Sequence, residues 1–454
     1  MRGYVRLLFG DAERSQASTA LPAGARTGCL TDQRLSQGKR RELFTHTVWA
    51  LEPIGVVHVP AIERASQRLQ RGFLAKDVRE HGAGMDYAPS APMAEPFSDI
   101  LCPALAELSS YTPVAGDYAV RLDANEAPEL LSAAAKQRLG EAAATLTWER
   151  YPDATSSQLR QALAAHSGVS AEEVLVGDGS DEIITMLLSA FSRARDRSGS
   201  PVIMTTTPSF VMYRMSARVR GQRVLEVPLD TSWDLALESM LRGIEHAPPN
   251  LIFIATPNNP TGNFADRERL EHLIQAASGS LVVIDEAYIP YSDRDHLDLY
   301  RRYENVAIMR TLSKIGFAAL RVGWLIARPS LLAEIDKVRL PYNMNAPAQL
   351  LGALAVTELA PEIRRIVSYV VTERERLSSG LAALPGVTVT PSQANFLWFR
   401  CERPASELFE GLKARGVLVR SFHQRGGRLA NQLRVTVGTG EENDRFLSCL
   451  RELT

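Results

Sequence analysis

Short apolar runs recur along the chain from about residue 171, and a longer stretch of mixed polar and apolar residues separates each run from the next. A short, continuous apolar run is typical of a strand that is buried on both faces, and the stretches between the runs are compatible with helices. This alternation predicts an α/β fold with a mostly parallel sheet and helices on both of its faces. The predicted strands are 174–176, 202–204, 251–255, 281–284, 306–309 and 322–326.

A different pattern begins after a linker that we expect at 341–347. A long helical stretch over 361–384 leads into further short apolar runs, which predict a smaller α+β domain. We therefore expect a large domain over 151–340 and a C-terminal small domain over 341–454, with residues 93–150 forming an N-terminal arm and part of the small domain. The further runs are 387–389, 396–399, 417–419 and 433–437.

Residues 1–92 lack this alternation and are broken by glycine and proline. Residues 61–78 are compatible with one amphipathic helix, although Gly72 interrupts it. We interpret residues 1–92 as a poorly specified N-terminal extension. One hypothesis is that the natural start is Met85 or Met93. The rival interpretation, a targeting or regulatory extension, has no support in the composition.

Composition narrows the classes of partner. The 454 residues are 45% hydrophobic and 23% charged, with a formal net charge of -1, so the chain is an ordinary globular protein and nothing favours nucleic acid or an anionic membrane as its partner. No apolar stretch approaches the roughly 20 residues that a membrane span needs. We therefore expect a small-molecule partner, no nucleic acid and no membrane.

Cysteine and histidine usage adds two further expectations. The cysteines show neither metal-ligand nor redox spacing, which favours a reducing compartment and predicts a cytoplasmic protein. None of the eight histidines pairs at a metal-binding spacing, so no metal is predicted. The cysteines are Cys29, Cys102, Cys401 and Cys449.

Asp285 and Lys314 are the strongest candidates for chemistry. Each follows an apolar run, and the carboxyl ends of strands are where open α/β sheets bind ligands. A lysine amine facing a buried carboxylate suits pyridoxal phosphate, whose aldehyde takes the amine and whose ring nitrogen takes the acid. Asp285 could instead be a surface carboxylate or a helix cap. The four apolar residues before it favour burial, where an unpaired charge is costly.

A glycine-rich turn at 177–182 could bind the phosphate of this cofactor. It lies between an apolar run and a helix-compatible stretch, so its backbone N–H groups and Ser180 and Asp181 would lie at a helix start. Any strand-to-helix turn can use glycine and serine, so an ordinary turn is the alternative. Three residues near Lys314 could complete the phosphate site: Thr311, Ser313 and Arg321.

Other candidates follow neighbouring runs. Asn259 and Tyr288 could hydrogen-bond the phenolic oxygen of the cofactor, and Phe210 could stack on its ring, although a turn asparagine and a core aromatic are the alternatives. Arg434 interrupts an apolar run, and Arg420 ends another. Both arginines are candidates to bind a substrate carboxylate or phosphate, with a solvated strand face as the alternative.

With these residues assembled, residues 93–454 resemble the histidinol-phosphate aminotransferases, a family of class-II, fold-type I aminotransferases that depend on pyridoxal phosphate. The order of the motifs carries the resemblance. The motifs are Arg-Leu-Asp-Ala-Asn-Glu-Ala-Pro at 121–128, Arg-Tyr-Pro-Asp at 150–153, the glycine-rich turn at 177–182, Pro-Ser-Phe at 208–210, Asn-Pro-Thr-Gly at 259–262, Asp-Glu-Ala-Tyr at 285–288 and Ser-Lys at 313–314.

The resemblance implies a role for each candidate residue. Lys314 would bind the cofactor aldehyde, and the catalytic set would include Asp285 on the ring nitrogen and Tyr288, with Asn259, on the ring oxygen. Tyr151 would reach the cofactor phosphate of the partner subunit, so the resemblance implies a homodimer with shared sites. The phosphate would otherwise be bound by Ser180, Asp181, Thr311, Ser313 and Arg321, and the substrate by Arg420, Arg434 and, from the neighbouring subunit, Tyr111.

The implied reaction converts histidinol phosphate and 2-oxoglutarate to imidazole acetol phosphate and glutamate, in histidine biosynthesis. Two enzymes of the same fold are alternatives, a threonine-phosphate decarboxylase and an aromatic amino-acid aminotransferase. A non-catalytic ligand sensor with an N-terminal DNA-binding module is an alternative of another class, but no basic helix-turn-helix pattern precedes Met93. The link from Lys314 to Arg321 is one residue shorter than in better-known members, which leaves open how Arg321 is aimed.

Overall fold

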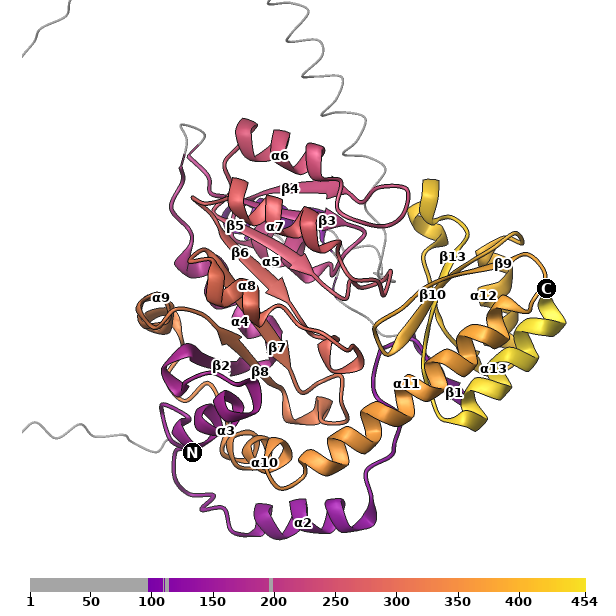
Figure 1. Ribbon diagram of the computed structural model, residues 1–454, viewed down its shortest axis with the longest axis horizontal. Coiled ribbons are helices and arrows are strands. Elements are labelled where there is room, and N and C mark those ends of the chain that lie inside the picture. Colours follow the sequence, from indigo (N-terminus) through magenta and orange to yellow (C-terminus); the bar gives the residue numbers. More distant parts are fainter. Residues whose placement is uncertain (1–96, 109, 111–113, 196–198) are drawn as a thin grey trace, which may run out of the picture. The chain divides into compact units, whose positions relative to one another are not determined.

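A computed structural model describes residues 97–454, apart from 109, 111–113 and 196–198 (Figure 1). The extension predicted over 1–92, with its expected helix and both alternative starts, lies outside the described residues. Within the described residues, no helix is both long and apolar enough to cross a membrane.

The larger domain is built on a seven-stranded sheet. Its strand β8 is antiparallel to both of its neighbours, and the other neighbouring pairs are parallel. The predicted mostly parallel sheet is therefore confirmed, and all six predicted runs lie in its strands. In spatial order the strands are β2 (Val174–Asp178), β8 (Val322–Ile326), β7 (Val306–Thr311), β6 (Leu281–Asp285), β5 (Leu251–Ala255), β3 (Val202–Thr207) and β4 (Arg223–Pro228).

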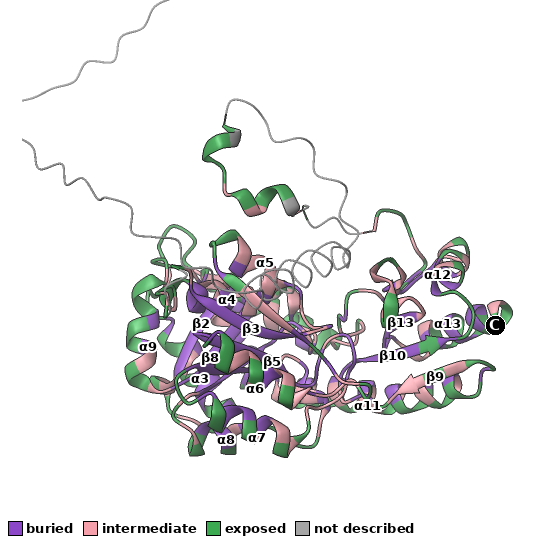
Figure 2. Cartoon of the chain, turned by 90° about the horizontal axis from the view of Figure 1, so that it is seen from above, coloured by how far each residue is buried: buried purple, intermediate pink, exposed green. Residues whose placement is uncertain are grey.

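Helices cover both faces of this sheet, because consecutive strand residues point to opposite sides. Val283 packs into the hydrophobic cluster on one face, and Ile284 packs into the cluster on the other. Figure 2 shows the strands buried between helices whose outer surfaces are exposed. One face carries α4 (Gly179–Ala190), α5 (Met212–Val219) and α9 (Pro329–Ile335). The other face carries α3 (Ser157–Ser167), α6 (Leu237–His246), α7 (Arg267–Ala276), α8 (Leu297–Arg302), α10 (Ala346–Val356) and the start of α11 (Ala360–Ala382).

The smaller domain contains an antiparallel four-stranded sheet, so the predicted α+β character is confirmed. A separate pair of short parallel strands joins β1 (Val120–Arg121) to β11 (Val417–Leu418). The four-stranded sheet has the order β12 (Arg420–Ser421), β13 (Gln432–Thr436), β10 (Phe396–Cys401) and β9 (Val387–Thr390). Its helices are α12 (Ala405–Ala414) and α13 (Gly440–Leu453), and α2 (Ala133–Ala144) packs beside α10. The short 3-10 helices are η1 (Ser98–Ile100), η2 (Pro103–Glu107), η3 (Ala171–Glu173), η4 (Ile289–Tyr291), η5 (Ala318–Leu320), η6 (Asp336–Val338), η7 (His423–Arg425) and η8 (Gly427–Leu429).

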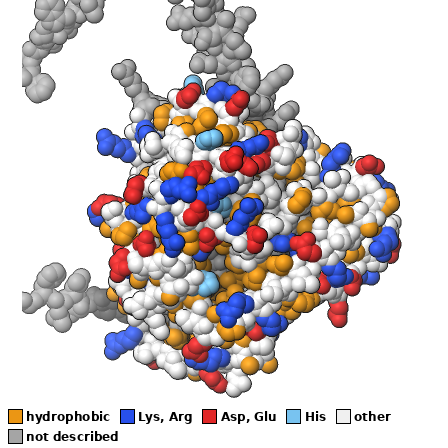
Figure 3. Space-filling model, in the orientation of Figure 1, with side chains coloured by type: hydrophobic (Ala, Val, Ile, Leu, Met, Phe, Trp, Pro, Cys, Tyr) orange, Lys and Arg blue, Asp and Glu red, His pale blue; other side chains and the backbone are white. Residues whose placement is uncertain are grey.

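Helix α11 runs from the larger domain to the smaller one (Figure 1). Its buried residues recur at helical spacing from Ile363 to Leu381, so one stripe faces the protein along its whole length. The buried guanidinium of Arg374 donates to the carbonyl oxygens of Tyr291 (3.0 Å) and Ala394 (3.1 Å) and thereby joins the two domains. On the face shown in Figure 3, acidic and basic side chains are interspersed, and hydrophobic side chains gather in a recess beside the start of α11.

Gly323 of β8 allows the backbone of the glycine-rich turn to approach closely. A Cβ at Gly323 would lie 2.4 Å from the carbonyl carbon of Gly179 and 2.5 Å from the nitrogen of Ser180. Both are backbone atoms at the start of α4, so they cannot move aside as a flexible side chain can. The position therefore requires glycine.

We expect Gly323→Ala to lower the free energy of unfolding by about 3 kcal/mol, because the added methyl group overpacks a backbone contact. Gly140→Ala is the matched control, since Gly140 lies exposed inside α2 with nothing within 4 Å of an added Cβ. This control should gain about 0.5–1 kcal/mol from helix propensity. The urea midpoints of the two variants measure the difference, and equal midpoints would contradict the close packing of Gly323.

Candidate active site

The predicted site residues lie at one edge of the seven-stranded sheet. Asp285 ends β6 and Thr311 ends β7, and the glycine-rich turn follows β2. Asn259 and Phe210 lie in the loops that follow β5 and β3. Because these five strands run in the same direction, their carboxyl ends meet at the same edge, and residues distant in sequence are brought together.

Asp285 is a buried carboxylate, only 5% exposed. Its Oδ1 accepts a hydrogen bond from the backbone N–H of Ala287 (3.0 Å), and its Oδ2 accepts one from the hydroxyl of Tyr213. Burial raises the pKa of Asp285 to about 6, and the Tyr213 hydrogen bond opposes this rise. The carboxylate is thus held in place but only partly compensated, which suits a cationic ligand group.

Tyr213, on α5, was not identified from the sequence. Its ring stacks on Phe253 with centroids 4.8 Å apart, and the ring of Phe210 meets it edge to face at 5.5 Å. Burial and the charge of Asp285 raise the pKa of Tyr213 well above its usual range, so the hydroxyl remains a donor. Tyr213 therefore links the candidate stacking residue to the candidate acid. The sequence signal was weak, being one aromatic residue one helical turn after Phe210.

Lys314 and Tyr288 are close to each other. The Lys314 Nζ lies 6.0 Å from the centroid of the Tyr288 ring, and the hydroxyl of Tyr291 donates to the backbone oxygen of Lys314. The Tyr288 hydroxyl accepts from Asn125 Nδ2 at 3.0 Å. Asn125 belongs to a motif noted in the sequence, but no role had been predicted for it. Its own backbone N–H donates to Thr436 Oγ1 (3.0 Å), so the smaller domain holds it in place.

The candidate phosphate site forms around the start of α4. The backbone N–H of Gly179 donates to the Arg321 carbonyl (2.6 Å), and Arg321 Nη2 contacts Asp181 Oδ2 at 3.0 Å. A Cβ at Gly179 would lie 2.5 Å from Arg321 Nη2. The shortened link from Lys314 therefore still places the guanidinium against the glycine-rich turn, with Arg321 in a left-handed conformation (φ 52°). The neighbouring hydroxyls belong to Ser180, Thr311 and Ser313, with Thr311 Oγ1 donating to Ser313 Oγ at 2.9 Å.

Arg434 and Asn259 contact each other across the two domains. Arg434 Nη1 donates to Asn259 Oδ1 at 2.6 Å, and Nη2 donates to the carbonyl of Asp123. Because the amide oxygen of Asn259 accepts from the arginine, its Nδ2 is directed elsewhere and can donate to a ligand. Arg420 lies directly opposite Arg434 in the β12–β13 register, so two guanidinium groups come from neighbouring strands.

Asn258, which had no predicted role, fixes the loop that carries Asn259. Its Nδ2 donates to the Pro208 carbonyl (3.1 Å) and to Thr261 Oγ1 (2.9 Å), while its Oδ1 accepts from Ser209 Oγ (3.0 Å). This side chain therefore ties the Asn259 loop to the loop that precedes Phe210.

Two predicted residues lie apart from this group or cannot be placed. Tyr151 is 81% exposed and stacks on Tyr342 with centroids 4.6 Å apart. Tyr111 lies outside the described residues. Among the residues that the structure describes, no group of histidine, cysteine and acidic side chains could hold a metal ion.

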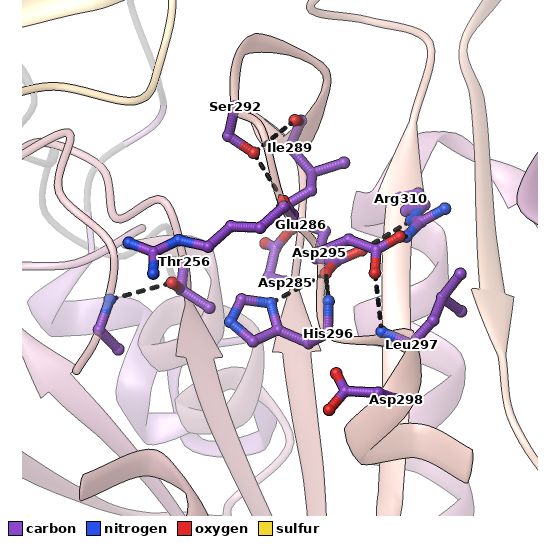
Figure 4. Close-up of polar contacts among 12 residues, drawn as sticks. Thr256, Asp285, Glu286, Ile289, Ser292, Asp295, His296, Leu297, Asp298 and Arg310 are labelled. Carbon is purple, nitrogen blue, oxygen red and sulfur yellow. Dashed lines mark hydrogen bonds and ion pairs between the residues drawn. The ribbon is translucent and has the colours of Figure 1, made fainter. Parts of the chain in front are cut away.

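Glu286 follows Asp285 directly, so strand alternation directs its side chain to the opposite face of the sheet, where it contacts His296 and Arg310 (Figure 4). Its carboxylate contacts Arg310 Nε at 2.7 Å and His296 Nδ1 at 2.9 Å, and Arg310 also contacts Asp295 at 2.9 Å. The buried charge of Glu286 is thus compensated within the protein. Of the two adjacent carboxylates, only Asp285 faces the candidate site.

Comparison with known proteins identifies similar chains. Residues 118–450 match the family model described as aminotransferase class I and II. The chain is 40% identical to a histidinol-phosphate aminotransferase of Methylibium petroleiphilum over 79% of this chain and 96% of that protein. It is 39% identical to one of Aquifex aeolicus over 77% of this chain and 96% of that protein.

Solved structures share the fold. The histidinol-phosphate aminotransferase of Sinorhizobium meliloti, in complex with pyridoxal-5'-phosphate, superposes with a TM-score of 0.69 at 24% identity, covering 80% of this chain and 99% of that chain. The enzyme of Clostridium acetobutylicum gives a TM-score of 0.66 at 21% identity, covering 74% and 98%.

The raised pKa of Asp285 predicts a pH-dependent stability for the cofactor-free protein. The unfolded carboxyl ionises near pH 4 and the folded one near pH 6, so the folded state binds more protons between these values. Stability should therefore fall as pH rises through this window. Relative to Asp285→Asn, the wild type should lose on the order of 3 kcal/mol between about pH 4 and pH 7, measured by urea unfolding.

Tyr213→Phe should make this loss larger, because removal of the hydroxyl donor raises the pKa of Asp285 further. Tyr300→Phe is the matched control, since it removes another tyrosine hydroxyl that donates to a carboxylate, that of Glu173, away from the site. Equal pH profiles for wild type and Asp285→Asn would show that the pKa is not raised.

Proposed function

Because this chain belongs to the class I and II aminotransferase family, we propose that it transfers the amino group of histidinol phosphate to 2-oxoglutarate, giving imidazole acetol phosphate and glutamate. The enzyme is an aminotransferase that depends on pyridoxal phosphate. The observation that carries the choice of substrate is the shared name of relatives at 37–40% identity, all histidinol-phosphate aminotransferases. This places the protein in histidine biosynthesis.

The described residues fit the cofactor. Asp285 is a buried carboxylate whose raised pKa reflects an incompletely compensated charge, and a protonated ring nitrogen would compensate it. Gly179 leaves room against Arg321 that a Cβ would fill, at the start of a helix whose backbone N–H groups suit a phosphate. When bound, pyridoxal phosphate supplies a ring that accepts the charge left when the α-proton of the substrate departs.

The chain's own residues would bind the cofactor and transfer the proton. Lys314 would hold the cofactor aldehyde through its amine and, once the substrate's amine replaces it, would take the α-proton from the substrate at Nζ. Tyr213 holds the Asp285 carboxylate in position, and Asn125 holds the hydroxyl of Tyr288, which would donate to the ring oxygen. Ser180, Asp181, Thr311, Ser313 and Arg321 would form the phosphate site.

The remaining residues would orient the cofactor ring and the substrates. Asn259 would donate to the ring oxygen through Nδ2, and Phe210 would stack on the ring. Arg434 would bind the carboxylate of glutamate, and Arg420 would bind the second anionic group. Both arginines are well placed for this, because their strands lie side by side at the edge that faces the Asn259 loop.

A homodimer with shared sites is supported by an exposed aromatic patch, formed by Trp148, Tyr151, Leu340 and Tyr342. Trp148 is 68% exposed and Leu340 is 71% exposed, and the stack of Tyr151 on Tyr342 joins the two segments. Exposed apolar patches of this kind mark protein interfaces. Asn343 follows the patch and donates to Glu182 of the glycine-rich turn (2.8 Å), so the patch adjoins the phosphate site.

We propose that the enzyme is cytoplasmic, because the described cysteines Cys102, Cys401 and Cys449 are free thiols, which suits a reducing compartment.

Histidinol phosphate, added without any keto acid, should convert the enzyme-bound aldehyde to the amine form of the cofactor. The absorbance band of the aldehyde form should disappear in the wild type. In Lys314→Ala the general base is missing, so conversion should slow by about 10³-fold or more. An unchanged spectrum in a wild-type sample that holds cofactor would reject this substrate and direct the search to threonine phosphate and aromatic amino acids.

Mixing two inactive variants tests the shared site. If Tyr151 acts in the partner's site, a hybrid of Lys314→Ala and Tyr151→Ala subunits has one site with both wild-type residues, and random mixing restores about a quarter of wild-type activity. If Tyr151 acts within its own subunit, no intact site forms. Activity that stays at the level of the separate variants would therefore overturn the shared site.

A further inference from the structure

A cavity of about 330 Å³ lies between the sheet of the larger domain and the start of α11. Arg310 and Trp324 of neighbouring strands line it together with Ile363 and Val367 of α11. Ile308 and Trp324 pack in the cluster on one face of the sheet, and Met309 and Val283 pack in the other, so strand alternation puts this cavity on the face opposite to the side chain of Asp285. Its volume lies within the range of small-molecule sites.

The walls of the cavity are mostly apolar. Ile289 and Pro290 come from the turn after Tyr288, and Ile315 follows Lys314 directly. Figure 3 shows the cavity from outside, as a recess of hydrophobic side chains beside the start of α11. Apolar walls of this kind suit an aromatic ring or a branched aliphatic group.

The titratable groups that line the cavity are His166, Glu286, Arg310 and Arg364. Glu286 and Arg310 pair with each other, as Figure 4 shows, so their charges cancel. Burial and the charge of Arg310 lower the pKa of His166, which makes it a neutral hydrogen-bonding group at neutral pH. The positive charge at the cavity therefore comes from Arg364.

Arg364 differs from its neighbours on α11. Arg365 pairs with Glu362 at 2.8 Å, and Arg376 pairs with Glu373 at 2.8 Å. Within the part of the chain that the structure describes, Arg364 has neither an ion pair nor a hydrogen bond from its side chain. An exposed guanidinium beside an apolar cavity complements a ligand with an apolar body and one anionic group.

We propose that this cavity is a second ligand site, on the face of the sheet opposite to the side chain of Asp285, which binds a small organic anion with an aromatic or branched aliphatic body. The ligand's anionic group contacts Arg364 and its apolar body lies against Trp324 and Ile363. Thr311 of the candidate phosphate site also lines the cavity. The ligand further touches the neighbours of three candidate active-site residues, since Glu286 follows Asp285, Ile289 follows Tyr288 and Ile315 follows Lys314.

The test is a fluorescence titration of the full-length, cofactor-loaded protein with 8-anilinonaphthalene-1-sulfonate, an aromatic anion that emits when bound in an apolar site. We expect saturable binding at one site per chain. The non-fluorescent anion 2-naphthoate should displace it, and the uncharged 2-naphthalenemethanol should need about tenfold higher concentration, because it lacks the charge-assisted contact.

Three variants locate the site. Arg364→Gln should weaken binding of the dye by about tenfold or more, whereas Arg365→Gln, which removes an equal charge from the adjacent residue, should change it by less than about twofold. Ser368→Trp places a large side chain at the cavity wall from an exposed helical position and should abolish binding. The absorbance of bound cofactor shows that each variant is folded.

Three results would overturn the proposal. The first is the absence of saturable binding to the wild type, which would also be the outcome if another segment or a second copy of the chain fills the cavity. The second is equal binding by Arg364→Gln and Arg365→Gln, or retained binding by Ser368→Trp. The third is displacement of the dye by excess 2-oxoglutarate or pyridoxal phosphate, which would place the dye in the active site.

Discussion

The buried carboxylate of Asp285 is the constraint around which this site is organised. A charge at the end of a strand that is covered on both faces is unfavourable unless hydrogen bonds and an opposite charge compensate it. Tyr213 and the backbone of Ala287 provide the hydrogen bonds. Within the described part of the chain they leave the pKa of Asp285 raised, so the protein itself completes only part of the compensation. A cation against Asp285 would therefore stabilise the site, and in the proposed function the protonated ring of the cofactor would provide it.

The pair Asp285-Glu286 shows how a strand end can place two equal charges in different surroundings. Their side chains leave the strand on opposite faces. Glu286 meets Arg310 and His296 and is compensated without any ligand, while Asp285 meets a tyrosine hydroxyl. The first arrangement fixes the structure at the ends of β6 and β7. The second leaves one charge available for chemistry. Neither assignment follows from composition, because the two residues are adjacent and both are acidic.

Six of the seven strands of the large sheet were predicted because each is a continuous apolar run. Edge strand β4 was missed because polar residues such as Arg223 and Glu226 interrupt its pattern. In the smaller domain the predicted run at 417–419 contains β11, whereas the two-residue strands β1 and β12 are too brief to carry a pattern of their own. Asp285 and Lys314 could be proposed from the sequence because each ends or follows a run, whereas Tyr213 and Asn125 make tertiary contacts that have no local signal. The position of the Arg321 guanidinium after the shortened link likewise could not be predicted, because Arg321 has a left-handed backbone conformation that the sequence does not specify.

The contacts of Arg374 connect the backbone of Lys314 to the smaller domain. Its guanidinium donates to Ala394 in the smaller domain and to Tyr291 in the larger one, and the Tyr291 hydroxyl in turn holds the backbone oxygen of Lys314. A single buried side chain on α11 thus links the smaller domain to the segment of the larger domain that contacts the backbone of Lys314. Three hydrogen bonds thus link Ala394 of the smaller domain to the backbone of Lys314, so the position of this lysine depends on how α11 packs against both domains.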